Sequence, residues 1–187
     1  ARLLPVPRIA TFDSVSLNIS ADRQFTKGDL YAAMEEYQKS LALDPANTTA
    51  RNSLGICFAR LGKHSAARKE FEAILEQTPD NHIALYNLGC LAMKEGETEA
   101  AEAALHRCLS LCPEHVYSRL RLGQLAETRH ALTEAREHFA AAAAHSDGEP
   151  ISHRHLARLA VKEGHPDRAR EHLHKALAHN PRDAYAM

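Results

Sequence analysis

Two cysteines and a histidine are the residues whose types and spacing could hold a metal ion. Cys108 and Cys112 are four residues apart, which suits one face of a helix, and His115 follows three residues later. Such a set is a conceivable zinc site. However, Cys108 lies two 34-residue repeat intervals before Ala176, so it occupies a position suited to a small residue in a helix core. Cys112 falls at an expected helix end. We therefore predict buried structural thiols, with no metal and no other cofactor.

The histidines form no comparable arrangement. The pairs His153/His155 and His172/His174 are two residues apart, so their members face different sides of a helix. No two of the 13 histidines have the four-residue spacing of a helical metal site. We therefore expect histidines on solvated helix surfaces. Because His153 and His155 are near Arg158, we also hypothesise that their protonation at lower pH strengthens binding to acidic peptides.

The remaining candidate nucleophiles lack catalytic partners. Cys57 and Cys90 fall near the inner side of expected helices, and the sequence places no base or orienting residue beside them. The sequence contains no Walker loop and no GxGxxG, HExxH or GxSxG motif. We therefore predict that the protein is not an enzyme.

The composition is that of an ordinary globular domain. The 187 residues are 44% hydrophobic and 25% charged, and the net charge is −1 when the histidines are neutral. This balance lacks the basic excess that draws a chain to nucleic acid, and no run of about 18 apolar residues could cross a membrane. Four cysteines without an evident disulfide framework suit a reducing compartment, so we expect a cytoplasmic protein.

One period governs the small and turn-forming residues. Gly55, Gly89 and Gly123 are 34 residues apart. Glycine, alanine, proline and large residues recur at the same interval at fixed offsets, in the rows Gly28, Gly62, Gly96 and Gly164; Ala33, Ala67, Ala101, Ala135 and Ala169; Pro45, Pro79, Pro113 and Pro181; and Tyr37, Phe71, Leu105, Phe139 and Leu173. A unit of this length accommodates two helices joined by a tight turn.

Each row has a physical role. Gly89 lies inside an expected helix, where it costs about 1 kcal/mol relative to alanine, because a small residue there lets the helix approach its partner closely. Gly96 ends that helix, since glycine tolerates the left-handed conformation that a helix stop needs. Pro113 marks the end of the second helix. In the fourth unit His130 replaces the turn glycine.

The stretches 52–79 and 85–113, with Leu-Gly, Gly, Ala, a large residue and Pro at fixed offsets, resemble the tetratricopeptide repeat family. The resemblance implies an all-α fold, namely a right-handed α-α superhelix of five 34-residue helix-turn-helix repeats. The repeats are expected at 14–47, 48–81, 82–115, 116–149 and 150–183, in a single domain over 14–183.

The two ends of the chain depart from this pattern. Residues 1–13 are expected to be a leader or linker, and 184–187 to begin a truncated or capping helix. The leader weakly resembles the junction that precedes such repeats in larger bacterial signalling proteins. The stretch VSLNIS, residues 15–20, alternates like a strand, but we favour a helix that begins near Asp13 or Ser14, because both are good N-caps.

In this family the first helices of the repeats line a concave groove that binds peptides. The matching positions here are Asn52, Tyr86, Cys90, Met93, Lys94, Tyr117, Leu120, Gln124, Arg154, Arg158 and Lys162, and the same mapping places Glu127 on this face. An apolar middle with a basic end fits a protein or peptide that has hydrophobic anchors and acidic residues. The resemblance thus implies a protein–protein interaction scaffold. The alternative is a self-association module that forms homo-oligomers of a larger protein through its repeat ends or its groove.

One familiar variant of the family's site is not expected. The carboxylate clamp that grips chaperone tails needs lysines and asparagines at set positions. Asn87 and Arg121 match it, but Asn52, Ile56 and Tyr117 stand where Lys, Asn and Lys are needed. The lost lysines would remove most of the charge meant for the carboxylate.

Overall fold

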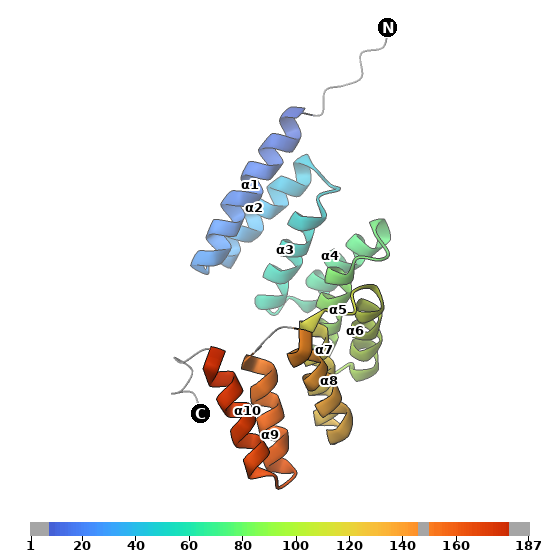
Figure 1. Ribbon diagram of the computed structural model, residues 1–187. Coiled ribbons are helices and arrows are strands. Elements are labelled where there is room, and N and C mark those ends of the chain that lie inside the picture. Colours follow the sequence, from blue (N-terminus) through green and yellow to red (C-terminus); the bar gives the residue numbers. More distant parts are fainter. Residues whose placement is uncertain (1–7, 146–149, 180–187) are drawn as a thin grey trace. The chain divides into compact units, whose positions relative to one another are not determined.

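The computed structural model describes residues 8–145 and 150–179, which form ten helices and no strand (Figure 1). The helices are α1 (Arg8–Lys27), α2 (Leu30–Leu43), α3 (Thr48–Arg60), α4 (His64–Gln77), α5 (His82–Glu95), α6 (Thr98–Leu111), α7 (Val116–Thr128), α8 (Leu132–His145), α9 (Pro150–Lys162) and α10 (Pro166–His179). The expected all-α fold of helix-turn-helix pairs is confirmed. Among these described helices, none is long and apolar enough to cross a membrane.

The chain divides into two compact units, Ala1–Leu91 and Ala92–Met187, with the boundary inside α5. In the first unit α1 packs on α2, α2 on α3, and α3 on α4. In the second unit α6 packs on α7, α7 on α8, α8 on α9, and α9 on α10. The pairs α1/α2 and α9/α10 each lie side by side in Figure 1.

Most first helices begin where the 34-residue register begins a unit. Helices α3, α5 and α7 begin at Thr48, His82 and Val116. The preceding residue caps each of them, because Asn47, Asn81 and His115 each accept a hydrogen bond from the backbone N–H three residues later. The repeat thus places a cap, as well as a core residue, at a fixed offset.

Helix α1 departs from the expected start. Residues 15–20 are helical, as predicted, but the helix begins at Arg8, so the prediction of an N-cap at Asp13 or Ser14 is wrong. Ser14 is instead fully buried within the helix, where the Ser40 hydroxyl donates to its carbonyl and the two hydroxyl oxygens are 2.9 Å apart. The remainder of the expected leader, residues 1–7, and residues 184–187 lie outside the described residues.

Left-handed residues stand between the helices of a pair. Gly62, Gly96 and Gly164 have φ angles of 73°, 77° and 77°, and His130 replaces a glycine with φ 60°. Backbone at this φ favours glycine, since a Cβ there crowds the carbonyl oxygen. The predicted helix-stop role of Gly96 is confirmed, and His130 adopts the same conformation despite its side chain.

The mid-helix glycines lie against aromatic rings. A Cβ built on Gly55 would lie 2.5 Å from Phe71 Cε1, and one on Gly123 would lie 2.6 Å from Phe139 Cε1. Both distances are too short for carbon atoms, so only glycine fits beside these rings. At these two positions the predicted packing role of the repeated glycine is confirmed.

The buried thiol is also where the pattern predicts it. Cys108 is fully buried, and its sulfur accepts a hydrogen bond from the Ser118 hydroxyl at 3.2 Å. Cys112 is half-buried at the C-cap of α6. His115 is engaged in capping α7. Within the described part of the chain, no three His, Cys, Asp or Glu side chains gather as a metal site would need.

The outer face of α1 differs from the equivalent faces of the later first helices. One row of this face is Ser16, followed at the repeat interval by Ala50, Ala84, Ser118 and Ser152, and only Ser16 is exposed. A second row is Arg23, followed by Cys57, Leu91, Leu125 and Leu159, and only Arg23 is exposed. The later residues are buried where each first helix meets the preceding pair, whereas α1 presents polar side chains there.

Candidate functional site

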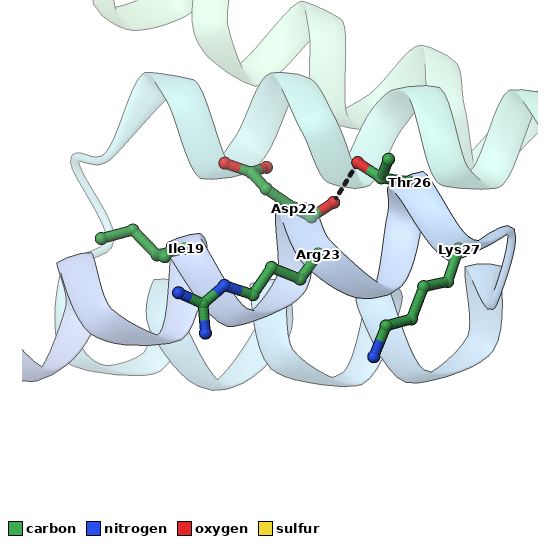
Figure 2. Close-up of a pocket in the computed structure, with 5 residues that line it drawn as sticks. All are labelled: Ile19, Asp22, Arg23, Thr26 and Lys27. Carbon is green, nitrogen blue, oxygen red and sulfur yellow. Dashed lines mark hydrogen bonds between the residues drawn. The ribbon is translucent and has the colours of Figure 1, made fainter.

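Hollows occur along the first helices of both units. In the first unit, one of about 480 Å³ follows the exposed side of α1 and is lined by Ile19, Asp22, Arg23, Thr26 and Lys27. Figure 2 shows these residues in succession along the helix, with the Thr26 hydroxyl donating to the Asp22 carbonyl. The Asp22 carboxylate accepts a hydrogen bond from the Tyr37 hydroxyl. This hollow is thus largely the surface of α1, and its acidic side chain, Asp22, already accepts a hydrogen bond.

A second hollow in the first unit lies at the start of two first helices. It measures about 120 Å³ and is lined by Thr48, Thr49, Asn52, Asn81 and Ile83. Asn52 Oδ1 accepts a hydrogen bond of 2.7 Å from Asn87 Nδ2. Asn87, one of the residues that match the chaperone clamp, is therefore bound to another asparagine.

A third hollow, lined by charged and polar side chains, lies in the second unit between α7 and α9, and we call it the α7–α9 pocket. It measures about 450 Å³. Its described lining residues are Gln124, Glu127 and Thr128 from α7 and His155, Arg158 and Lys162 from α9. Residues from the C-terminal part of α7 and from the middle and end of α9 therefore face one space, as the equivalent places of Gln124 and Arg158 in successive repeats imply.

Glu127 is the acid of this pocket, and it holds two cations. Its oxygens lie 2.5 Å from Arg158 Nη2 and 2.6 Å from Lys162 Nζ. The Glu127 side chain is only 9% exposed, whereas Arg158 and Lys162 are about half exposed. Burial raises the pKa of Glu127, but hydrogen bonds from Lys162 and Arg158 outweigh it and lower the pKa overall. The carboxylate is therefore ionised and fixes both cations at the rim.

His155 forms the wall of the pocket. Its ring is stacked on Phe139, and its Nδ1 lies 2.9 Å from Arg158 Nη2. Burial lowers the pKa of His155, and the charge of Arg158 lowers it further. The expectation of a solvated surface histidine is therefore wrong for His155, because the aromatic ring behind it removes water from one face. Its lowered pKa means that His155 becomes a cation only at a lower pH than an ordinary histidine does.

Of the neighbouring histidines, two are half-buried and one is exposed. His153 and His172 are half-buried and stack on one another, with ring centroids 5.5 Å apart and Nδ1 atoms 3.4 Å apart. Burial and the nearby Lys175 lower the pKa of His172. His174 is exposed, as expected. His153 and His172 lie on different helices, so the spacing of histidines within one helix does not reveal that they stack.

The predicted groove residues fall into three groups. Gln124, Arg158 and Lys162 meet in the α7–α9 pocket. Leu120 is only 5% exposed and packs in the core with Phe139, so it offers little surface to a peptide. The others lie outside this pocket, with Asn52, Tyr86, Cys90 and Met93 half-buried and Lys94, Tyr117 and Arg154 exposed.

Two features of the pocket were not predicted. The ion pairs of Glu127 join residues 31 and 35 positions apart, and opposite charges close to one repeat length apart could have revealed them. The stacking of His155 on Phe139 joins the first helix of one repeat to the second helix of the preceding one. No short motif signals that contact, since it depends on how successive pairs pack.

Comparison with known proteins agrees with the repeat pattern and the helix pairs. Family models for the tetratricopeptide repeat match residues 24–88 and 128–187 in one case and 86–150 in another. No curated protein sequence is a significant match.

Several solved structures share the fold. MamA from Desulfovibrio magneticus RS-1 has 20% identity and a TM-score of 0.73, over 92% of this chain and 98% of that chain. PilF from Pseudomonas aeruginosa has 20% identity and a TM-score of 0.82, over 90% of this chain and 77% of that one. YrrB, described as a repeat protein with an unusual peptide-binding site, has 22% identity and a TM-score of 0.63, over 95% of each chain. With the family models matching most of the sequence, the chain belongs to the tetratricopeptide repeat family.

Proposed function

We propose that the protein is an interaction scaffold that binds a partner peptide along the first helices of its second unit. The α7–α9 pocket is the observation that supports this proposal, because it gathers fixed, half-exposed cations beside a hollow large enough for a side chain. Recognition of acidic motifs by clustered basic side chains is one recurring mode of peptide binding. The reported peptide-binding site of YrrB, a protein of the same fold, is consistent with it.

An exposed aromatic side chain that offers apolar surface to a peptide lies on α7, one of the two helices that line the pocket. Tyr117, which is 52% exposed, precedes Gln124 by seven residues and so lies on the same side of α7. Seven residues of helix span about 10 Å. An extended peptide covers that distance in about three residues. We therefore expect ligands that have an apolar residue about three positions from an acidic one.

Self-association through stacked repeat ends is less well supported. The exposed Ser16 and Arg23 on the outer face of α1 would have to be buried in such a contact. Burying an unpaired guanidinium costs several kcal/mol. The described N-terminal face therefore disfavours end-to-end assembly.

A peptide-display selection on the full chain tests the proposal. Peptides that bind wild type should carry the apolar and acidic pair, and should lose affinity for the variants Tyr117→Ala and Arg158→Glu. Arg170→Glu provides the control, because it makes the same change of charge, and Arg170 is exposed on α10 and does not line the pocket. Circular dichroism establishes that each variant is folded. Failure to select any peptide, or equal binding to all three variants, would refute the scaffold function at this site.

A further inference from the structure

Three polar contacts run in series through the α7–α9 pocket from one arginine to another. Arg121 Nη1 donates to Gln124 Oε1 at 3.0 Å. Gln124 Nε2 lies 3.3 Å from His155 Nε2. His155 Nδ1 lies 2.9 Å from Arg158 Nη2. Each contact needs one donor and one acceptor to be a hydrogen bond.

This series is one acceptor short. A guanidinium only donates, whereas a neutral imidazole and the amide each have one group of each kind to offer their two neighbours here. Three contacts need three acceptors, but Gln124 and His155 supply one each. One contact must therefore set two N–H groups against each other.

No internal rearrangement of these groups removes the conflict. If His155 Nδ1 accepts from Arg158, the proton on Nε2 faces the Gln124 amide nitrogen. If the Gln124 amide is turned over, its NH2 group faces the guanidinium of Arg121. If His155 instead carries its proton on Nδ1, that N–H faces the guanidinium of Arg158. Protonation of His155 would add another donor, and burial already opposes it.

Glu127 does not supply the missing acceptor in this arrangement. One of its oxygens accepts from Arg158 and the other from Lys162. The described lining of the pocket thus has one carboxylate against two cations, beside an N–H group that faces another N–H group. Both the charge and the hydrogen bonding favour an anion with oxygen acceptors.

We infer that the α7–α9 pocket binds a carboxylate group of an acidic peptide, which accepts the hydrogen bond that Gln124 and His155 cannot complete between themselves. This inference rests on the proposed function and specifies its ligand. The carboxylate belongs either to an Asp or Glu side chain or to a peptide C-terminus, since both present the same two oxygens. A hydrogen bond to a charged carboxylate is stronger than one between two neutral groups.

Titrations of the full chain followed by NMR test this inference. The probes are acetyl-tetraglutamate amide, acetyl-tetraglutamine amide and acetyl-tetraglutamine with a free C-terminus, and the protein carries ¹⁵N-labelled histidine. We expect tetraglutamate amide to shift the His155 ring nitrogens and tetraglutamine amide to leave them unchanged. A shift with the free-acid tetraglutamine would add the C-terminus as a source. If neither carboxylate probe shifts His155, the inference is wrong.

A variant that supplies the acceptor internally gives a second test. In Gln124→Glu, one carboxylate oxygen can accept from Arg121 and the other from His155, so the pocket no longer needs a ligand. We expect binding of tetraglutamate amide to weaken about tenfold or more, with an unchanged or higher Tm. Gln38→Glu, which makes the same substitution at an exposed position of α2 outside the pocket, should bind like wild type.

The two tests separate this inference from the proposed function. If display-selected peptides bind wild type, Gln124→Glu and Gln38→Glu equally, the scaffold remains but the carboxylate subsite is refuted. If Gln124→Glu alone loses acidic peptides while it remains folded, a carboxylate subsite beside Gln124 is supported.

Discussion

The imidazole of His155 lies flat on the ring of Phe139, with centroids 4.4 Å apart and planes 7° apart. The same Phe139 ring fills the space left by the missing side chain of Gly123. One aromatic ring therefore packs α8 against α7 and also supports a wall of the α7–α9 pocket on α9. Changes in the core packing of one repeat should alter the binding pocket that it shares with the next.

The lowered pKa of His155 predicts that stability falls with acid. The pKa of His155 is lowered by burial in the native state, while in the unfolded chain it returns to about 6.5. Below that pH the unfolded state binds more protons, so the free energy of unfolding should decrease as the pH falls. Urea unfolding at pH 7.5 and pH 5.5 measures this. His155→Gln should reduce the difference, and an equal difference in the variant would contradict the assignment.

A paired substitution tests the glycine–aromatic contacts. Gly55→Ala should destabilise by about 1–3 kcal/mol, because its Cβ would overlap the Phe71 ring. In the fifth repeat the equivalent residues are Ala157 and Leu173, which pack in one cluster. Gly55→Ala with Phe71→Leu should therefore be more stable than Gly55→Ala with the ring retained. A thermal double-mutant cycle measures the coupling, and additive effects would show that the two residues do not share the space.

His130 offers a simple gain in stability. It is the non-glycine residue with positive φ in the described part of the chain, at a position where other repeats have glycine. Relief of the left-handed strain should make His130→Gly more stable by up to about 1 kcal/mol. The opposite change, Gly62→Ala, should destabilise through the backbone alone, because no atom lies within 4 Å of the added Cβ. Chemical denaturation of both variants checks the sign of each effect.

Removing the pocket's own carboxylate should favour an incoming one. In Glu127→Gln, Arg158 and Lys162 lose their internal ion pairs and become available to a ligand. We expect tetraglutamate amide to bind a few-fold more tightly, in line with about 0.2–1 kcal/mol for a half-exposed ion pair. Isothermal titration at low ionic strength measures the change.

Added salt serves as the control for this prediction. Screening should weaken binding to both wild type and Glu127→Gln, because Arg158 and Lys162 are half exposed. Weaker binding by the variant at every salt concentration would show that Glu127 positions the cations rather than competing with the ligand.

The helices and turns follow from the sequence because each has a local cause. Gly96 at a left-handed turn and Gly55 against an aromatic ring are fixed by the shape of the residue itself. The 34-residue period then places turn residues and small packing residues at equivalent positions in successive helix pairs. The first helix is the exception, since Ser14 could cap a helix but bonds Ser40 from inside one.

The site is less predictable because its contacts cross between repeats. Gln124, Arg158 and Lys162 are predicted from their places in the repeat, and the structure brings them together. Leu120 has a similar place but is buried, because it packs in the core that α7 forms with α8 and α9. The charge state of His155 depends on Phe139 behind it, which is known only once the helices are packed.

The polar outer face of α1 has a consequence for anyone who builds longer arrays from this chain. A helix pair grafted ahead of α1 would press its second helix on Ser16 and Arg23, at positions that hold Ala50 and Cys57 one repeat later. The graft would join covalently yet remain a separate folding unit. Exchanging Ser16 and Arg23 for the residues of the next repeat would convert this polar face into a site of cooperative growth.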